Sequence, residues 1–252
     1  MGEYDLTVND IENGIKRFLS EAYATASVSE NPELIFISAG PGAGKTTIEN
    51  FLKRKLKGKG EKSFEVSSDK VAMYDPRYDD AIEELPEECY RITRQFVRQA
   101  MPKIMEELMK HKINIINERT FGRYKEDIDL IKKFRESGYK ITSNIIATDI
   151  FESRLSCFER DARTLKLGLR PRGCSLENQL RMYNSFIVGI QELDRLGLLD
   201  NINVFVRGEN INKPPILVYT KEGKQYPSFV EAINNERIKQ RKKLYENSSR
   251  IF

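Results

Sequence analysis

The chain is poor in the residues on which several classes of protein depend. Its three cysteines, Cys89, Cys157 and Cys174, are odd in number and far apart in a chain of 252 residues. This excludes a disulfide framework and a zinc-binding spacing, and it indicates reduced thiols in a cytoplasm. The single histidine, His111, stands between two lysines at the expected end of a helix. A surface position beside the negative end of the helix dipole is favoured there, which argues against histidine-based catalysis.

Long apolar runs are absent as well. No stretch approaches the length that spans a membrane, so a membrane protein is excluded. Residues 1–9 have neither a basic start nor an apolar stretch and do not resemble a secretory signal. No linker rich in Pro, Gly or Ser interrupts the chain, which favours a single domain over residues 1–252. The net charge of +4 suits anionic phosphate substrates but does not indicate nucleic acid.

The most informative stretch that is present is a glycine-rich loop. It follows the apolar run Leu34–Ile37 and ends in Gly44, Lys45 and Thr46, where a helix is expected to begin. A strand, a glycine-rich loop, Gly-Lys-Thr and a helix form the P-loop arrangement, which binds nucleoside triphosphates. N–H groups of the loop and of the helix start then point at phosphate oxygens. The predicted ATP-binding residues of the loop are Gly40, Pro41, Gly42, Ala43, Gly44, Lys45, Thr46 and Thr47.

Two side chains of this loop have predicted roles. Lys45 is expected to reach the β- and γ-phosphates of ATP, and the hydroxyl of Thr46 is expected to hold Mg²⁺. Ala39 stands where the usual spacing has its first glycine, and alanine is the smallest replacement for glycine. A glycine-rich turn with a purely structural role would not explain the Lys-Thr pair directly after Gly44.

Apolar periodicity predicts an α/β fold. A helix over about 8–27 precedes a core over about 33–220, and a polar helix over about 227–247 follows it. The alternating strands and helices predict a P-loop kinase-like three-layer sandwich, with a mainly parallel sheet, helices on both faces and an arginine lid. Pro102, within a helix expected over about 87–111, predicts a kink or a break. Strands are expected at about 34–38, 63–67, 113–116, 140–147, 202–206 and 216–219.

Two carboxylates follow expected strands, as the glycine-rich loop does. Parallel sheets bind ligands beyond the carboxyl ends of their strands, so Asp69, Glu118 and the loop are expected to line one crevice. Asp69 is the best candidate for a base that takes the proton of an acceptor hydroxyl; a helix-capping or exposed acid fits its position equally. Glu118 could hold substrate hydroxyls or reach magnesium through water, and the alternative is a salt bridge to Arg119 or a nearby lysine.

Other P-loop classes fit the sequence less well. The guanine-reading Asn-Lys-x-Asp motif of GTPases is not matched, because Asn212-Lys213 is followed by two prolines. The strand ending in Asp-Glu that ATPase motors carry is matched only loosely by Ile113 to Glu118. A small-molecule kinase needs a base, a pocket and arginines on a lid, which grip the transferred phosphoryl group. Candidate lid arginines, for which a solvated helix face is the alternative, are Arg154, Arg160, Arg163, Arg170 and Arg172.

At these residues the chain resembles the zeta toxin family of bacterial toxin–antitoxin systems, which includes PezT-type toxins. The phosphate loop matches at Gly40–Thr47. The segment from Asp69 to Pro76 resembles the family's Asp-x-x-x-x-x-His-Pro element, with Asp75 in place of the histidine. The segment Glu118–Arg123 resembles its Glu-Gly-Thr-Gly-Arg element, with Arg119 in place of a glycine and the final arginine displaced by one.

The resemblance implies roles for single residues. Asp69 falls on the family's catalytic base, and Arg160, in the pair Glu159-Arg160, falls on its first lid arginine. Arg172 falls nearest to the second lid arginine, with Arg170 as the alternative. Glu118, Thr120 and Arg123 are implied to bind substrate, and Arg207 to lie near the nucleotide base. Pro102 stands where the family has a glutamate that helps to hold the sugar, and Glu106 lies one turn away.

The function that the resemblance implies is transfer of the γ-phosphate of ATP, with Mg²⁺, to the 3′-hydroxyl of UDP-N-acetylglucosamine or a related nucleotide sugar. It also implies a small helical antitoxin as partner. Two other hypotheses stay open. One is a P-loop kinase of another acceptor, such as a nucleoside, a metabolite or a polynucleotide end. The other is a nucleotide-dependent binding protein with little chemistry.

Overall fold

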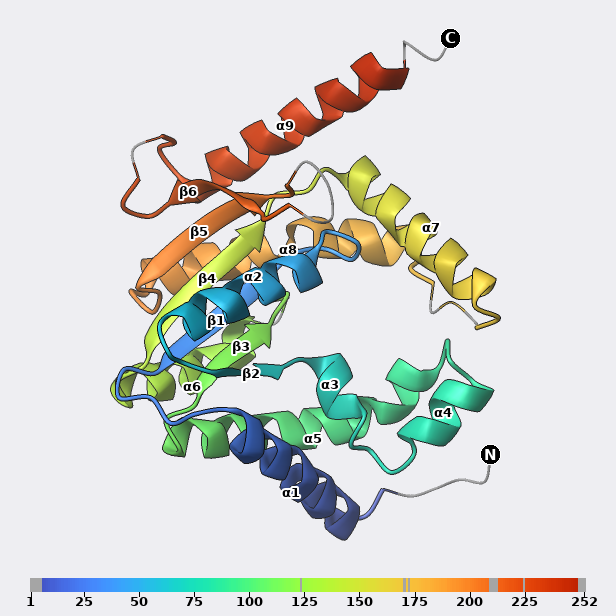
Figure 1. Cartoon of the computed structure of the whole chain (residues 1–252), viewed down its shortest axis with the longest axis vertical. Helices are drawn as coiled ribbons and strands as arrows, with labels where there is room; N and C mark the ends of the chain where they lie inside the picture. Colours follow the sequence, from blue (N-terminus) through green and yellow to red (C-terminus); the bar gives the residue numbers. More distant parts are fainter. Residues whose placement is uncertain are drawn as a thin grey trace.

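The computed structural model describes residues 6–248, apart from 123, 170, 172, 209–212 and 224 and the side chains of 247 and 248. Its centre is a six-stranded sheet with the order β2-β3-β1-β4-β5-β6 (Figure 1). The pairs up to β5 are parallel, and β6 pairs with β5 antiparallel. The mainly parallel sheet predicted from the sequence is confirmed. The strands are β1 Glu33–Ser38, β2 Ser63–Val66, β3 Asn114–Glu118, β4 Lys140–Ile146, β5 Asn201–Val206 and β6 Ile216–Thr220.

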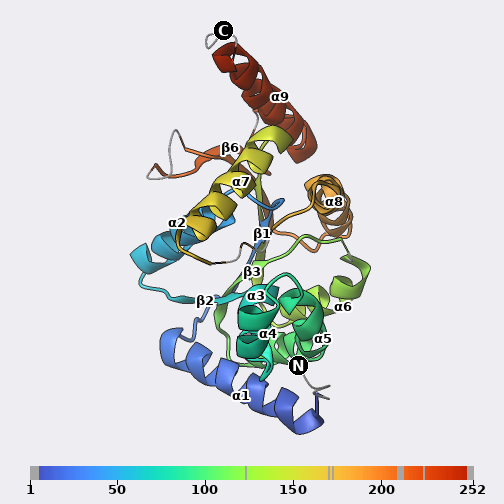
Figure 2. The same cartoon turned by 90° about the vertical axis from the view of Figure 1, so that its right-hand side faces the viewer.

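Helices cover both faces of this sheet. Seen along the sheet, α2 and α7 lie on one side, and α5, α6 and α8 lie on the other (Figure 2). The helices on both faces that the sequence predicted are therefore confirmed. The helices are α1 Val8–Thr25, α2 Lys45–Gly58, α3 Ser68–Ala72, α4 Tyr78–Glu84, α5 Cys89–Lys110, α6 Tyr124–Glu136, α7 Ile150–Lys166, α8 Leu176–Arg195 and α9 Phe229–Ser248.

The central strand β1 shows why two layers of helices are needed. Its side chains alternate between the faces of the sheet, as they do in any strand. Leu34 and Phe36 join the larger core, to which α1, α5, α6 and α8 contribute, whereas Ile35 and Ile37 pack against α2. A strand that is apolar on both faces is typical of a parallel sheet, because water would otherwise reach one face.

Buried asparagines interrupt these apolar strands and connect them. Asn117 of β3 donates a hydrogen bond to the carbonyl of Val66 on β2 at 2.7 Å. Asn144 of β4 donates to the carbonyl of Phe36 on β1 at 3.2 Å. Burying an amide side chain costs stability unless its polar atoms find partners. The polar positions inside the predicted strands therefore tie neighbouring strands together.

Three features differ from the sequence predictions. Helix α5 continues through Pro102, so the predicted break is wrong. Its buried residues on either side, Met101 and Ile104, keep both halves packed on the core, and this burial offsets the lost backbone hydrogen bond. The short helices α3 and α4 were not expected. Glu118 is the last residue of β3 rather than the second residue after it, because the pairing with β1 extends to Ile37.

The N-terminal helix α1 begins at a capping box. The hydroxyl of Thr7 accepts a hydrogen bond from the backbone N–H of Asp10 at 3.2 Å, and the Asp10 carboxylate accepts from the backbone N–H of Thr7 at 3.0 Å. Its apolar face is buried through Ile11, Ile15 and Phe18. Within the described part of the chain, no helix combines the length and the apolar character that crossing a membrane requires.

Candidate functional site

Three segments meet at the edge of the sheet where the parallel strands end. The strand register places Glu118 of β3 beside Ile37 of β1, and Val66 of β2 beside the residue before Glu118. The glycine-rich loop leaves β1 at this edge, and α3 with Asp69 follows β2 there (Figure 1). Strands β3 and β4 lie on the two sides of β1, which makes this edge a topological switch point. Open α/β sheets bind their ligands at such points.

The glycine-rich loop turns through two left-handed glycines. Gly42 has a φ angle of +70°, and Gly44, with a φ of +96°, is the N-cap of α2. No side chain caps this helix start, and the N–H of Thr47 donates to the carbonyl of Gly44 at 3.1 Å. The N–H groups of Lys45 and Thr46, which come before it, suit an anion. Lys45 lies along the loop and donates from Nζ to the carbonyl of Gly40 at 3.3 Å. A Cβ added to Gly40 would meet nothing within 4 Å, so open space adjoins the loop at that residue.

Two side chains that follow β4 hold the loop by its carbonyls. Thr148 is buried and donates its hydroxyl hydrogen bond to the carbonyl of Ala43 at 3.1 Å. Ser153 of α7 donates to the carbonyl of Pro41 at 2.5 Å. These contacts fix the carbonyls of Ala43 and Pro41, and the N–H of Ala43 donates within the loop to the carbonyl of Gly40 at 3.4 Å. Sequence reasoning missed both residues, although Asp149, the N-cap of α7, marks this segment as a helix start.

Arg207, the first residue after β5, holds the loop from the same side. Its Nε donates to the carbonyl of Ala43 at 3.2 Å, and one terminal nitrogen donates to the carbonyl of Gly42. The other terminal nitrogen donates to the hydroxyl of Ser156 at 2.8 Å. Burial lowers the pKa of the Arg207 guanidinium, and the charge of Glu152 opposes that shift. Arg207 therefore supports the phosphate loop directly, and its contact with a nucleotide base stays a prediction.

Asp69 lies in the first turn of α3. The N-cap of this helix is Ser67, whose hydroxyl accepts a hydrogen bond from the backbone N–H of Lys70 at 3.1 Å. Asp69 is therefore not the capping residue, and its side chain is exposed at the ligand-binding edge. Its charge contributes to the raised pKa of Glu118, so the two acids interact electrostatically.

The charges of Lys45 and Asp69 act on the pKa of Glu118 in opposite directions. Burial raises the pKa of Glu118, the charge of Lys45 lowers it, and the charges of Glu65 and then Asp69 raise it. The alternative of a salt bridge to Arg119 is not what the structure shows, because Arg119 binds Asp127. Among the described residues, the positive charge that lowers the pKa of Glu118 is that of Lys45, at the end of the phosphate loop.

Beyond β3 the chain carries Thr120 and a strained residue. Thr120 is half-buried two residues after Glu118. Phe121 is buried in the left-handed region with a φ of +49°, and its ring lies 5.0 Å from that of Phe36. A bulky residue in that region is uncommon and costs energy, so packing of the ring must hold it there. Arg123, predicted to bind substrate, lies outside the described residues.

The arginines of α7 take two arrangements. Arg160 is exposed and its guanidinium donates to the neighbouring Asp161 at 3.2 and 3.3 Å. Arg154 points to the segment before α8, where it donates to the carbonyl of Cys174. The structure thus does not bring Arg160 onto the phosphate loop by a hydrogen bond. Arg163, like Arg160, pairs with an acid of its own helix, Glu159, at 3.7 Å. The last two lid candidates, Arg170 and Arg172, lie outside the described residues.

The strand order, the left-handed loop that opens a helix, and the acids at the same edge define a P-loop kinase-like protein. Within this class, the chain belongs to the zeta toxin family, whose model matches residues 19–213. The resemblance noted in the sequence is thereby confirmed. Toxin PezT of Streptococcus pneumoniae is 21% identical over 208 residues, which cover 81% of this chain and 79% of that toxin.

Solved structures show the same fold. One from the PezAT chromosomal toxin–antitoxin system of Streptococcus pneumoniae has a TM-score of 0.71 at 18% identity and covers 96% of this chain and 99% of that one. A structure of AvrRxo1-ORF1:-ORF2 with ATP has a TM-score of 0.53 at 14% identity and covers 90% of this chain and 71% of that one. These likenesses confirm the predicted P-loop kinase-like fold.

Proposed function

We propose that the protein is an ATP-dependent phosphotransferase that transfers the γ-phosphate of ATP to a nucleotide sugar. The observation that carries the proposal is the arrangement at the sheet edge. The phosphate loop with Lys45, Glu118, and α3 with Asp69 stand at the ends of three neighbouring parallel strands. Membership of the zeta toxin family supports this reading. So does the AvrRxo1-ORF1:-ORF2 structure with ATP, which shares the fold.

The phosphate loop supplies the cradle for ATP. Backbone N–H groups of the loop and the helix start, among them those of Gly42, Gly44, Lys45 and Thr46, would hold its phosphates. Lys45 would exchange its contact with the neutral carbonyl of Gly40 for charged phosphate oxygens, and hydrogen bonds between charged groups are the stronger kind. Thr148 and Arg207 would keep the loop in shape during this exchange, because both hold the carbonyl of Ala43.

The oxygen donors at this edge fit magnesium. Thr46 is exposed in the first turn of α2, and Glu118 lies within electrostatic reach of the adjacent Lys45. Hydroxyl and carboxylate oxygens, together with phosphate oxygens, are the hard ligands that Mg²⁺ takes. We propose Thr46 as the protein ligand, with Glu118 reached through water. Bound there, the ion would neutralise charge on the phosphates.

Asp69 would act as the general base. It takes the proton of the acceptor hydroxyl while that oxygen bonds to the γ-phosphorus and the bond to ADP breaks. The acceptor proton can leave late in such a reaction, so a carboxylate of ordinary basicity serves. Glu118, Thr120 and Arg123 would hold the acceptor. Arg160 and Arg172 or Arg170 would close on the γ-phosphate, which for Arg160 requires release from Asp161.

The proposed acceptor is the 3′-hydroxyl of UDP-N-acetylglucosamine. Family membership supports it, and one departure weighs against it. The residue at the position of the sugar-holding glutamate is Pro102, and Glu106 one turn later is paired with Lys133 at 2.7 Å. This departure favours, as the second candidate, a kinase that acts on another nucleotide sugar, a nucleoside or a metabolite.

Mass spectrometry of the product tests the proposal. Purified protein with ATP, Mg²⁺ and UDP-N-acetylglucosamine should yield a sugar nucleotide that is heavier by one phosphoryl group. A Lys45→Ala variant should yield none, because it lacks the phosphate-binding ammonium group. A panel of other nucleotide sugars, nucleosides and oligonucleotides runs in parallel. If no UDP-sugar gains a phosphate while another acceptor does, the sugar assignment fails and the second candidate replaces it.

We further propose that a small helical antitoxin holds the protein inactive. Support comes from the family and from the PezAT toxin–antitoxin structure, whose fold this chain shares. Expression of the chain alone in a bacterium should arrest growth. Harmless expression of an active enzyme would contradict the role of toxin and indicate a housekeeping kinase.

A further inference from the structure

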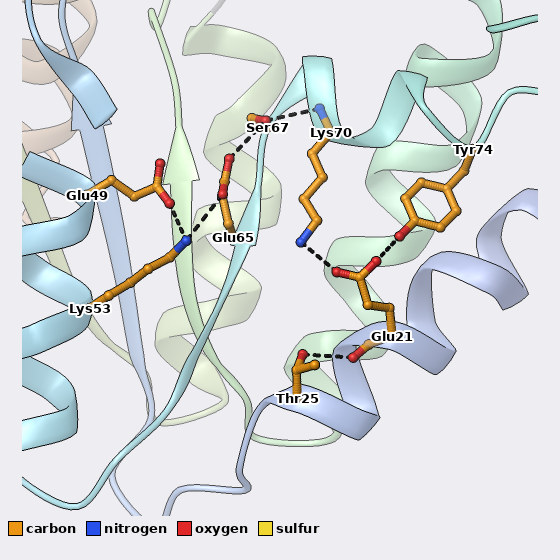
Figure 3. A network of polar contacts seen from close by, with 8 residues as sticks. All are labelled: Glu21, Thr25, Glu49, Lys53, Glu65, Ser67, Lys70 and Tyr74. Atoms are coloured by element: carbon orange, nitrogen blue, oxygen red, sulfur yellow. Dashed lines mark hydrogen bonds and ion pairs between the residues drawn. The ribbon is translucent and has the colours of Figure 1, made fainter. Parts of the chain in front are cut away.

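A line of polar contacts runs from the phosphate-loop helix α2 to the helix that carries Asp69. Figure 3 shows it crossing β2: Glu49 and Lys53 come from α2, Glu65 from β2, and Ser67 from the cap of α3. Lys53 connects α2 to β2, because its ammonium group contacts the carboxyl groups of both Glu49 and Glu65. The line thus connects α2 with α3, and phosphoryl transfer would need these two helices to be correctly placed relative to one another.

Each link in the line is a hydrogen bond or an ion pair of the described residues. Lys53 Nζ lies 3.3 Å from Glu65 Oε2, and the other oxygen of Glu65 accepts from the hydroxyl of Ser67 at 3.4 Å. The Ser67 oxygen in turn accepts from the backbone N–H of Lys70 at 3.1 Å. Glu65 therefore orients the hydroxyl that caps α3, and Asp69 lies inside the capped turn.

Glu65 carries its charge in a half-buried place. Its side chain is 25% exposed. Burial on its own would raise the pKa of Glu65, but the hydrogen bond from Glu49 and the charge of Lys53 outweigh it and lower the pKa. A charged acceptor in a partly dry setting makes stronger contacts than a surface acid does. Glu65 is thus suited to hold the cap firmly.

The opposite side of α3 is held by α1. The ammonium group of Lys70 lies 3.0 Å from Glu21 and 3.8 Å above the ring of Phe64. Tyr74, just beyond α3, also donates to Glu21 (Figure 3). On the side of the phosphate loop, Glu65 contributes a polar contact between α2 and the cap of α3.

We propose that Glu65 is a positioning residue for Asp69, which couples the phosphate-loop helix, through Lys53, to the Ser67 cap of α3. The inference rests on the proposed function, because it takes Asp69 as the base. Glu65 does not touch ATP or the acceptor in this scheme. It acts through Ser67 and, by its charge, on the pKa of Glu118. Its removal should change the placement of the base and leave the contacts of Thr148, Ser153 and Arg207 with the phosphate loop in place.

The variant Glu65→Gln keeps the shape of the side chain and removes its charge. Turnover at saturating ATP is expected to fall about ten-fold, while the Kd of ATP stays within about two-fold. The matched control is Glu33→Gln. Glu33 is 22% exposed and pairs with Lys59, at the end of α2, at 2.9 Å, but it lies at the other end of the sheet. That control should leave both quantities unchanged.

A double-mutant cycle separates positioning from general loss of structure. Ser67→Ala should lower turnover, and Glu65→Gln combined with Ser67→Ala should cost little more than either alone, because both break one line. Ser67→Thr, which keeps the hydroxyl, should restore turnover. Fully additive losses, or a loss of ATP affinity that matches the loss of turnover, would overturn the proposal.

Hydrogen exchange supplies a readout that needs no activity. Without the charge of Glu65 the Ser67 hydroxyl is oriented less firmly and caps α3 less well. Exchange at the α3 amides should therefore speed up about five-fold in Glu65→Gln and stay unchanged in Glu33→Gln. Unchanged α3 exchange in Glu65→Gln contradicts the positioning role. If α3 exchange rises but the wild type transfers no phosphate to any acceptor, the proposed function has failed and the coupling of Glu65 to α3 stands.

Discussion

At the scale of single residues, Gly42 shows how tightly the phosphate loop is enclosed. Its φ of +70° suits glycine, and a Cβ added there would lie 2.8 Å from the sulfur of Cys157 and against the carbonyl of Ser153. Both neighbours belong to α7, so this helix packs directly on the loop. Gly60, after α2, has a similar φ of +80°, but a Cβ there would meet nothing within 4 Å.

Because Gly42 and Gly60 share a left-handed backbone and differ in their surroundings, replacing each by alanine gives a prediction with its own control. Gly42→Ala and Gly60→Ala both place alanine in the left-handed region, which costs about 1–2 kcal/mol. Only Gly42→Ala also pushes α7 away, so it should lower the melting temperature further and weaken ATP binding more than about ten-fold. Thermal unfolding and titration calorimetry measure these effects. Equal ATP affinity in the two variants would contradict the packing of α7 on the loop.

Other residues of the site show what the sequence could reveal. The position of Lys45 and Thr46 at the start of α2 was predictable from local spacing in a glycine-rich loop, and their roles toward phosphate and magnesium stay predictions. The supports of that loop were not predictable, because Thr148, Ser153 and Arg207 meet its carbonyls only once β1, β4 and β5 have paired. Their partners lie more than a hundred residues away along the chain, and no local pattern records such a contact.

At the scale of elements, α2 contains a buried carboxyl group, that of Glu49, and its loss of a proton should lower the stability of the fold. Burial raises the pKa of Glu49 to about 7 from an ordinary value of 4.5, and Lys53 opposes this shift. Between these values the folded chain holds the proton and the unfolded chain has released it. The free energy of unfolding should therefore fall as pH rises through this window and level off above it.

Urea unfolding at pH values from about 5 to about 8 measures this dependence. In Glu49→Gln, the part of the fall that comes from this carboxyl should disappear, because an amide does not titrate. The exposed Glu12→Gln serves as control and should follow the wild type. An identical pH dependence in Glu49→Gln and wild type would show that Glu49 does not hold its proton in the folded chain.

Elements also show where sequence reasoning stopped. The long helices and apolar strands were predicted because their periodicity is strong. The five-residue helix α3 was not, since its formation depends on the Ser67 cap and on contacts of Lys70 with α1. The left-handed Phe121 was equally hidden. Gly189 of α8 leaves room for it, and a Cβ there would lie 2.6 Å from Phe121 Cβ.

At the scale of the whole molecule, the position of the candidate site was predicted from one rule, that parallel sheets bind ligands beyond the carboxyl ends of their strands. It predicted that segments after different strands meet at one edge, and the register shows that they do. The direction of β6 was not predictable from its apolar pattern, which is the same in either orientation. A strand that returns without a crossover helix pairs antiparallel, as β6 does. The contacts of the lid arginines with a phosphate stay a prediction.

The central claim is that Asp69 and the phosphate loop face each other across one crevice. Asp69 acts as the base there, and the loop binds ATP. Single-turnover transfer by Asp69→Asn, with the Kd of ATP measured in parallel, tests it most directly; exposed Asp79→Asn is the control. The account predicts a rate that falls about 10²–10⁴-fold with ATP affinity unchanged. A wild-type rate, or a loss of ATP binding as large as the loss of rate, would contradict it.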